Sequence, residues 1–470
     1  MPGGITLRHW HDECGVFGAW QDPEAARMTY LGLYAQQHRG QESAGIVSLK
    51  GSEHLSHRGC GLVGEVFTES VLEHLEGSAA IGHVRYSTTG LNEQINIQPL
   101  MAQLLNGPVA LAHNGNIVNS HILRRELKEQ GAIFQGTNDT ECLLHLLARH
   151  PSDDIVTCLR ETVPRLEGAF SLVLLTRDRL VALRDPMGFR PLVLGQRPLE
   201  GGGSSYVVAS ETCAFDLIGA KLVREIEPGE IFWLDSEGEH SEFLPSAPRR
   251  AQCVFEHVYF ARPDSTVFGL SVYESRKNMG RILAQESAVD ADIVIPVPDS
   301  GVPAAIGYSV ESGLPFELGI IRNHYIGRTF IQPSQSIRSF GVKIKLNPQS
   351  QVIRGKRVVV IDDSLVRGTT SQKIIRLIRQ AGAKEVHFRI ASPPTTGPCF
   401  YGVDTPKKSQ LIAAQQTQEE IRRFIDADSL SYLSIEGMLK AVGARDQEYC
   451  AACFDGQYPT PLFGLDQEET

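Results

Sequence analysis

Short apolar runs rich in β-branched and aromatic residues dominate the first half of the chain. Helical spacing appears only between blocks of these runs, at residues 28–41, 119–132 and 140–150. Strands are predicted at residues 13–20, 43–49, 79–88, 108–117, 170–176, 180–185, 205–211 and 229–235. Strands at this density, with helices between the blocks, predict an α+β domain of layered sheets that ends near residue 245.

The pattern changes after a proline-containing, charged seam at residues 244–252. Residues 292–298 and 356–363 form continuous apolar runs, each followed by a glycine-containing turn and a helical pattern. Runs that are apolar on both faces are typical of a parallel sheet covered by helices, so an α/β domain is predicted over 253–408. Residues 409–470 are predicted to form short helices that pack back onto the body.

Composition and charge narrow the classes of function. A chain of 470 residues is too long for one ordinary core, and a net charge of −10 argues against a protein that coats nucleic acid. The sequence has neither an apolar run of membrane-spanning length nor the apolar core of a signal peptide. Nine cysteines, an odd number, do not indicate a disulfide framework. A cytoplasmic location without membrane contact is therefore expected.

The stretch "VVVIDDSLVRGTT" (358–370) carries the clearest chemical signal. A buried strand delivers Asp362 and Asp363 to its carboxyl end, where open α/β sheets bind ligands. The small-residue loop that follows enters a helix N-terminus, which suits a phosphate. Two carboxylates beside a phosphate would repel it unless they hold hydroxyls or Mg²⁺, so the stretch predicts a site for a phosphorylated sugar.

This stretch closely resembles the phosphoribosyl pyrophosphate (PRPP) loop of type I phosphoribosyltransferases. The resemblance implies that Asp362 and Asp363 meet ribose hydroxyls and Mg²⁺, and that Ser300 in "VPDSG" contacts the metal and pyrophosphate. It also implies that the segment 325–335 is a lid, with Arg328 binding PRPP. The residues implied to surround the 5′-phosphate are Ser364, Arg367, Gly368, Thr369 and Thr370.

Cys14 lies in "HWHDECGVFGAW" (9–20), and its residue type allows two interpretations. It is either a small buried hydrophobe or a nucleophile. An internal cysteine has an amide nitrogen and no base, so the second interpretation requires cleavage before Cys14. A free α-amine has a pKa of about 7.7 to 8.0 and can take the thiol proton near neutral pH. The second interpretation thus predicts a propeptide, residues 1–13, that is removed.

Further segments favour the nucleophile, because together with Cys14 they resemble class II glutamine amidotransferases, which are N-terminal-nucleophile hydrolases. The resemblance implies that Cys14 attacks the glutamine amide, while the Asn114 side chain and the Gly115 N–H stabilise the oxyanion. It further implies that Arg85 pairs with the glutamine α-carboxylate and Asp139 with its α-ammonium. The segments that carry the resemblance are 36–46, 82–90, 112–119 and 137–141.

Four cysteines outside these motifs stand in settings that could bind metal. Cys450 and Cys453 form a C-x₂-C pair, while Cys253 and Cys399 lie far away in sequence. Spacing alone leaves open zinc, an iron–sulfur cluster, or a redox pair with two buried cysteines. The remaining cysteines are interpreted as structural thiols: Cys60, Cys142, Cys158 and Cys213.

Over nearly its whole length the chain resembles the glutamine–PRPP amidotransferases. The resemblance implies a layered αββα N-terminal-nucleophile hydrolase domain (14–245) followed by an α/β phosphoribosyltransferase domain. It implies Mg²⁺ as a cofactor, a structural [4Fe–4S] cluster held by Cys253, Cys399, Cys450 and Cys453, purine nucleotides as feedback inhibitors, and a homo-oligomer. The implied reaction makes 5-phosphoribosylamine, glutamate and pyrophosphate from glutamine, PRPP and water. The alternatives are a PRPP-binding regulator and another synthase coupled to a class II glutaminase.

Overall fold

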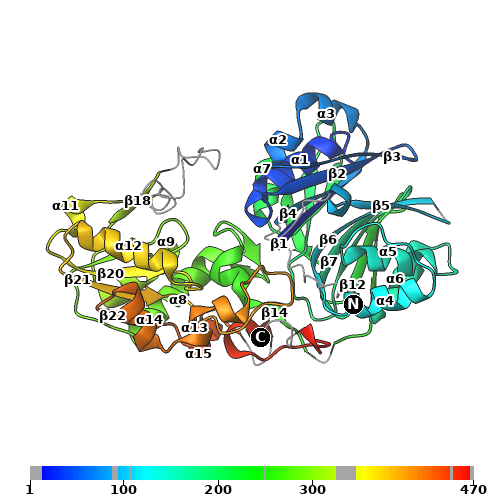
Figure 1. Ribbon diagram of the computed structural model, residues 1–470. Helices are drawn as coiled ribbons and strands as arrows, with labels where there is room; N and C mark the ends of the chain where they lie inside the picture. The colour runs from blue at the N-terminus through cyan, green and yellow to red at the C-terminus, as the bar shows by residue number, and fades with distance from the viewer. Residues whose placement is uncertain are drawn as a thin grey trace, which may run out of the picture.

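The structure is a computed structural model that describes residues 13–86, 94–105, 107–247, 249–323, 346–444 and 448–465. Two lobes lie side by side, and the C-terminal segment runs below the junction between them (Figure 1). The propeptide predicted before Cys14, apart from Glu13, and the predicted lid with Arg328 lie outside the described residues. None of the helices in the described part of the chain has the length and apolar character needed to span a bilayer.

The first lobe contains two antiparallel sheets. One has the strand order β11-β9-β10-β1-β4-β2-β3 and the other β13-β12-β8-β7-β6-β5. The strands of the first sheet are β1 Glu13–Trp20, β2 Ser43–Lys50, β3 Glu53–Cys60, β4 Ala79–Tyr86, β9 Val193–Pro198, β10 Ser204–Ala209 and β11 Lys221–Glu225. Those of the second are β5 Leu100–Leu104, β6 Gly107–Ile117, β7 Gly168–Leu175, β8 Leu180–Arg184, β12 Glu230–Leu234 and β13 Glu239–Phe243.

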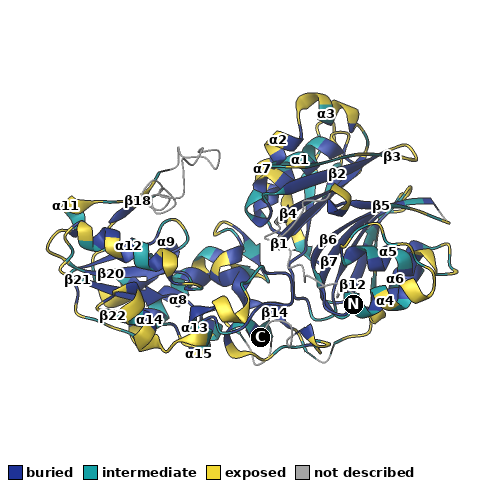
Figure 2. Cartoon of the chain, viewed as in Figure 1, coloured by how far each residue is buried: buried dark blue, intermediate teal, exposed yellow. Residues whose placement is uncertain are grey.

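Helices cover the outer face of each sheet, so the lobe has four layers. Alternating side chains such as Val16 and Val173 fill the space between the sheets, and every strand near the centre is buried (Figure 2). The layered αββα fold predicted from the sequence is confirmed. The helices over the first sheet are α1 Ala25–Ala35, α2 Val63–Val66, α3 Glu69–His74 and α7 Cys213–Ile218; those over the second are α4 Ser120–Glu129, α5 Thr140–Ala148 and α6 Ile155–Thr162.

The helix predicted over 28–41 is shorter at its C-terminal end than its apolar spacing indicates. Helix α1 ends at Ala35, and a 3₁₀ turn, Gln37–Arg39, follows. The physical reason is Arg39, whose side chain is completely buried and donates from Nε to the carbonyl oxygen of Cys14 at 3.1 Å. A continued α-helix would carry this residue along the helix axis instead of into the sheet, so a tertiary contact overrides the local pattern.

The second lobe contains a four-stranded parallel sheet of order β17-β20-β21-β22, as predicted for an α/β domain. Its strands are β17 Ile293–Pro296, β20 Arg357–Asp362, β21 Glu385–Ile390 and β22 Ser429–Tyr432. One face packs against α8 Val272–Glu286, α9 Val302–Ser312 and α15 Ile435–Ala441; the other packs against α12 Thr369–Gln380 and α14 Gln418–Ile425. Strand β20 is apolar on both faces because helices cover both.

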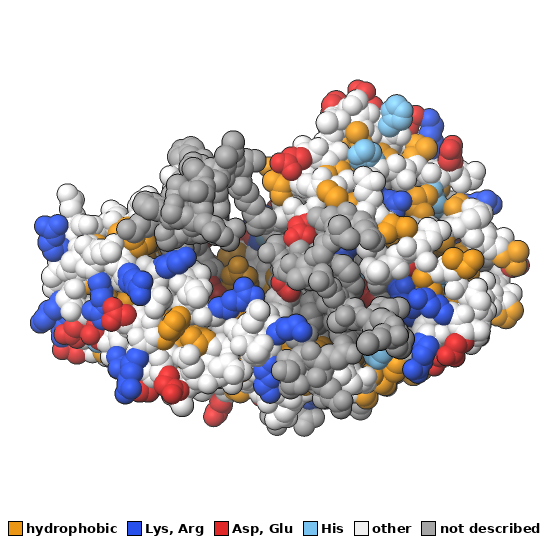
Figure 3. Space-filling view, in the orientation of Figure 1, with side chains coloured by type: hydrophobic (Ala, Val, Ile, Leu, Met, Phe, Trp, Pro, Cys, Tyr) orange, Lys and Arg blue, Asp and Glu red, His pale blue; other side chains and the backbone are white. Residues whose placement is uncertain are grey.

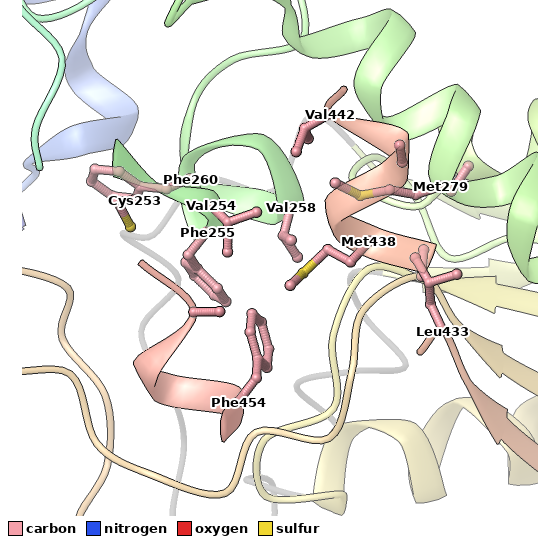
Figure 4. Packing of buried hydrophobic residues seen from close by; sticks show 14 of the residues in the cluster. Cys253, Val254, Phe255, Val258, Phe260, Met279, Leu433, Met438, Val442 and Phe454 are labelled. Carbon is pink, nitrogen blue, oxygen red and sulfur yellow. The ribbon is translucent and has the colours of Figure 1, made fainter. Parts of the chain in front are cut away.

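The segment after residue 408 is not a purely helical appendage. Strand β22 pairs in parallel with β21 and completes the sheet, so part of this segment belongs to the second lobe. The C-terminal end instead reaches the junction of the lobes, where β14 (Gln252–Cys253) pairs with β23 (Tyr449–Cys450). There Phe454 of α16 (Ala452–Asp455) packs against Phe255, with ring centroids 6.2 Å apart (Figure 4).

Candidate active sites

Cys14 lies on β1, one of the inner strands of the first sheet. Its side chain is 1% exposed, and its register partner on β4 is Arg85, itself a predicted site residue. The carbonyl oxygen of Cys14 accepts the hydrogen bond from Arg39. The sheet therefore brings Cys14 and Arg85 together across adjacent strands, and Arg39 fixes the backbone of Cys14.

Arg39 belongs to a buried ion-pair network that reaches into the second half of the chain. Its guanidinium donates to Glu211 and, at 2.6 and 3.1 Å, to the carboxylate of Glu256. Arg190 also pairs with Glu256, at 2.8 Å. Burial opposes the charge of Arg39, but Glu256 and Glu211 raise its pKa above the usual value. All four side chains are completely buried. Because water does not reach them, the two carboxylates supply the counter-charges for the two guanidinium groups.

Sequence reasoning missed the partners of Arg39. Glu256 comes from a π-helical turn, Glu256–Phe260, that follows β14, and the Arg39 guanidinium lies 4.3 Å from the ring centroid of Phe260. The available signal was a single acid inside the apolar run "CVFEHVYF" (253–260), because a buried carboxylate requires a cationic partner. The sequence pattern gives no indication of which arginine that partner is.

Asn114 and Gly115 lie on β6, in the sheet that faces Cys14. Asn114 Nδ2 donates to Ser210 Oγ at 3.3 Å, and the same oxygen accepts from the backbone N–H of Val16 at 3.0 Å. Ser210 therefore bridges the strand of Cys14 and the strand of Asn114. The second Nδ2 hydrogen of Asn114 remains for another acceptor, which suits a donor to an oxyanion.

Asp139 caps helix α5 and accepts from the backbone N–H groups of Ile117 at 2.8 Å and Thr140 at 2.7 Å. Burial alone would raise the pKa of Asp139, but His113 and these hydrogen bonds lower it overall. The carboxylate thus stays ionised. It contacts the last residue of β6, the strand that also carries Asn114 and Gly115. An ionised carboxylate is what a bound α-ammonium requires.

His83 has a structural role in this lobe, because its side chain links β4 to β6. Its Nε2 lies 3.1 Å from the carbonyl oxygen of His113, and burial lowers the pKa of His83 to about 3. An imidazole with this pKa stays neutral near pH 7 and is a poor general base. A terminal amine on Cys14 therefore remains the better candidate for the base.

In the second lobe, β20 ends at Asp362 and α12 begins at Thr369, with Gly368 at its N-cap. Asp362 and Asp363 are 9% and 6% exposed, and Ser364 Oγ donates to Asp363 at 2.6 Å. Burial and the neighbouring acid raise the pKa of Asp362 well above its usual value. Burial also raises the pKa of Asp363, although hydrogen bonds from Ser300 and Ser364 oppose that shift.

A cavity of about 1010 Å³ opens beside this loop at the junction of the lobes. Phe189 of the first lobe and Tyr259 of the π-helical turn line it together with the loop. In the orientation of Figure 1, the surface is hollowed between the lobes, and both basic and acidic side chains lie near the hollow (Figure 3). The predicted PRPP residues that line the cavity are Asp362, Ser364, Arg367, Gly368, Thr369 and Thr370.

The four cysteines predicted to bind a cluster line the same cavity: Cys253, Cys399, Cys450 and Cys453. None of the four forms a disulfide, and Cys253 pairs in register with Cys450 across β14 and β23. Burial raises the pKa of Cys253 to about 12 and raises those of Cys450 and Cys453 well above the usual value. In the described parts of the chain, no group of three or more His, Cys, Asp or Glu residues is arranged to hold a single metal ion.

Two domain families match the chain in the order of its lobes. A glutamine amidotransferase domain matches residues 83–216, and a phosphoribosyl transferase domain matches residues 272–391. The chloroplastic amidophosphoribosyltransferase 1 of Arabidopsis thaliana is 54% identical over 449 residues, 95% of this chain and 79% of that protein. The amidophosphoribosyltransferase of Bacillus subtilis is 49% identical over 462 residues, 97% of this chain and 96% of that protein.

Solved structures match both lobes together. A structure described as the allosteric regulatory enzyme of purine biosynthesis superposes with a TM-score of 0.92 at 48% identity, covering 96% of this chain and 97% of that one. The glutamine PRPP amidotransferase of B. subtilis, in complex with ADP and GMP, matches with a TM-score of 0.89 at 48% identity, covering 96% of this chain and 98% of that one.

Proposed function

This chain belongs to the amidophosphoribosyltransferase family, and we propose that its lobes divide that reaction between Cys14 and the loop of residues 362–370. The enzyme converts glutamine, PRPP and water into 5-phosphoribosylamine, glutamate and pyrophosphate, the first committed step of de novo purine synthesis. The observation that supports this division of roles is that the first lobe brings Cys14 and Arg85 into register on adjacent strands, while the loop after β20 lines a cavity beside the second lobe.

In the first lobe, the Cys14 sulfur attacks the glutamine amide carbon while the α-amine of the same residue takes the thiol proton. Asn114 and Gly115 donate to the oxyanion that forms, and ammonia leaves. Arg85 and Asp139 hold the α-carboxylate and α-ammonium of glutamine. The register of Cys14 with Arg85 and the bridge from Ser210 to Asn114 support these assignments. Water then hydrolyses the thioester.

In the second lobe, Asp362 and Asp363 hold the ribose hydroxyls, and the loop N–H groups surround the 5′-phosphate. The two acids and Ser300 fit Mg²⁺, because burial opposes their ionisation and a divalent cation offsets that cost. Bound Mg²⁺ would stabilise the charge of departing pyrophosphate. Arg328 is proposed to contact PRPP from the lid. The other loop residues proposed to bind PRPP are Ser364, Arg367, Gly368, Thr369 and Thr370.

Ammonia is proposed to pass from Cys14 to the ribose C1 through the junction of the lobes. Free ammonia is mostly protonated near neutral pH, so a sheltered route keeps it nucleophilic. Phe189 of the glutaminase lobe lines the same cavity as the PRPP loop, and Asn116, beside Gly115, contacts the carbonyl of Phe400 at 2.9 Å. These contacts support a short path between the two sites.

The four cysteines around the junction fit a [4Fe–4S] cluster better than zinc. None of Cys253, Cys399, Cys450 and Cys453 forms a disulfide, and all four line one cavity without being arranged around a single ion. In a [4Fe–4S] cluster each thiolate binds a different iron, so the four sulfurs do not have to surround one point. Its proposed role is structural: it would tie the C-terminal end to the seam between the lobes.

Regulation and assembly follow from the family. A relative has been solved with ADP and GMP, so purine nucleotides are proposed as feedback inhibitors of this chain. A homo-oligomer and a cytoplasmic location are also proposed, although the plant relatives are named as chloroplastic. The proposed glutaminase domain is 14–245, and the proposed phosphoribosyltransferase domain begins at 253 and includes β22.

Mass spectrometry and metal analysis of the purified chain test the proposal directly. The mature chain is expected to begin at Cys14, because an internal cysteine has no α-amine to act as base. It is expected to carry about four irons per chain and no zinc. Full glutaminase activity in a chain that keeps Met1 to Glu13 would contradict the mechanism, and stoichiometric zinc would contradict the cluster.

The variant Asp362→Asn tests the PRPP site. We expect PRPP binding to weaken about 10- to 100-fold, as a charge-assisted hydrogen bond contributes about 1.5–3 kcal/mol. The pKa of Asp362 lies above its unfolded value, so ionisation of this carboxyl at higher pH costs stability. The neutral Asn should therefore raise the unfolding temperature of the Mg²⁺-free protein near neutral pH. The measurements are the KM for PRPP and thermal unfolding.

Asp426→Asn is the matched control for this variant. Asp426 is exposed at the end of α14, and its backbone φ of 64° is one that asparagine also adopts readily. We expect neither the KM for PRPP nor the unfolding temperature to change. An unchanged KM in Asp362→Asn would remove Asp362 from the proposed site.

A further inference from the structure

The segment that follows Cys399 presses against the strand that carries the proposed oxyanion donors. Asn116 Nδ2 on β6 donates to the carbonyl oxygen of Phe400 at 2.9 Å. Gly402 lies so close to Gly115 that a Cβ built on it would be 2.9 Å from both the Cα and the carbonyl carbon of Gly115. The second half of the chain therefore touches the backbone of the glutaminase site directly.

The contact requires glycine on both sides. Gly115 has a φ of 146°, and a Cβ there would lie 2.0 Å from the carbonyl oxygen of Ala169 on β7. Gly402 has a φ of 91°, which side chains rarely adopt. Gly115 is thus held between β7 on one side and Gly402 on the other, and the atoms that a Cβ on Gly402 would meet first are all backbone atoms of Gly115.

The segment itself is anchored on both sides of the contact. The backbone N–H of Cys399 donates to Thr405 Oγ1 at 2.6 Å. The ring of Tyr401 stacks on Phe189 with centroids 4.3 Å apart, and its hydroxyl is 3.0 Å from Thr460 Oγ1. Residues 399–402 therefore form a rigid support and not a loose loop passing over the strand.

We propose that Gly402 is a positioning residue for glutamine hydrolysis: the segment 399–402 holds Gly115 at the position where its N–H meets the oxyanion. The proposal rests on the roles proposed above for Cys14, Asn114 and Gly115. An oxyanion donor acts over a narrow range of about 2.7–3.1 Å, so a displacement of a few tenths of an ångström weakens it. Gly402 itself touches no reacting atom and acts through Gly115.

The variant Gly402→Ala tests the proposal in the full-length enzyme. We expect kcat for glutamine hydrolysis to fall about 10- to 100-fold with little change in KM, because the contact affects the transition state more than substrate binding. Synthesis from added ammonia is expected to stay within about twofold of the parent, since Gly402 itself does not line the cavity beside the proposed PRPP loop. Equal losses in both activities, or an unchanged kcat for glutamine, would overturn the proposal.

Gly355→Ala is the matched control for backbone strain. Gly355 lies in the same lobe and has a φ of 74°, but a Cβ there meets no atom within 4 Å. Both variants carry the strain of a left-handed alanine, and only Gly402→Ala displaces Gly115.

Asn116→Ala is the second variant, for use if Gly402→Ala does not fold. It removes the hydrogen bond to the carbonyl of Phe400, and we expect it to lower kcat for glutamine in the same selective way, by a smaller factor. An Asn116→Ala variant without this selective loss would overturn the proposal.

An analogue of the tetrahedral intermediate distinguishes a displaced oxyanion donor from a general loosening of the glutamine site. Glutamate γ-semialdehyde accepts the Cys14 sulfur at its carbonyl carbon; the S–C bond forms, the C=O π bond opens, and the thiol proton ends on the oxygen. Gly402→Ala is expected to weaken binding of this aldehyde by the factor lost in kcat while glutamate binds as before. Equal weakening of both would overturn the proposal.

The variant Cys14→Ala separates failure of the proposed function from failure of this inference. If Cys14→Ala still hydrolysed glutamine, the proposed function itself would fail. If Cys14→Ala lost glutamine hydrolysis while Gly402→Ala kept the kcat of the parent, only this inference would fail.

Discussion

The variant Cys14→Ala is expected to lose glutamine-dependent synthesis of 5-phosphoribosylamine by at least about a thousandfold, because the attacking sulfur is gone. Synthesis from added ammonia should persist, since Cys14 does not line the cavity beside the proposed PRPP loop. Pyrophosphate release measured with glutamine and, separately, with ammonium salt at mildly alkaline pH gives both rates. The alkaline condition supplies the unprotonated nucleophile.

Cys142→Ala provides the control for removal of a buried thiol. Cys142 is completely buried beneath the second sheet of the same lobe and has no proposed role in the reaction. We expect both activities to remain, with a loss of about 1 kcal/mol in the free energy of unfolding. If both variants lost the glutamine-dependent activity alike, Cys14 could not be assigned as the nucleophile.

The variant Glu256→Gln is expected to lower the free energy of unfolding by about 3–5 kcal/mol, because it leaves buried cations without their counter-charge. Arg39 and Arg190 both pair with this carboxylate, and neither side chain reaches solvent. Urea unfolding followed by the fluorescence of Trp20 and Trp233, both in the first lobe, measures the change. Glutamine-dependent activity should fall more than ammonia-dependent activity, as Arg39 also holds the carbonyl of Cys14.

An exposed ion pair supplies the comparison. Glu69 pairs with Arg27 at 3.0 Å on the surface of the same lobe, where water already solvates both charges. Glu69→Gln is expected to unfold at the same urea concentration as the parent. A midpoint for Glu256→Gln equal to that of Glu69→Gln would show that the buried network does not stabilise the junction.

The parts of the fold that local pattern specifies were predictable. Strand β20, its acidic pair and the start of α12 follow one another within a single stretch, so residue order alone predicted a site for a phosphorylated sugar there, and the family resemblance added PRPP as its ligand. The layered class of the first lobe also followed from strand density. Strand β22 was missed because it is short and half polar, and only its pairing with β21 makes it a strand.

The features that join the two lobes could not be predicted from the pattern. The pairing of Arg39 with Glu256 and the contact of Gly402 with Gly115 depend on tertiary geometry between distant segments. A glycine or an arginine in a sequence does not indicate its distant neighbour. Cys14, Asn114 and Gly115 were identified through family resemblance, and their arrangement across two facing sheets emerged only from the structure.

The short pairing of β14 with β23 has a consequence for how the molecule is made. The ribosome synthesises the strands and helices of both lobes before residues 448–465, so Cys253 and Phe255 cannot contact Cys450 and Phe454 until that segment has been made. Until then their apolar surfaces stay open to water and to other nascent chains. Assembly of the junction is therefore a late event in biogenesis, and the four thiols can be brought together only after it.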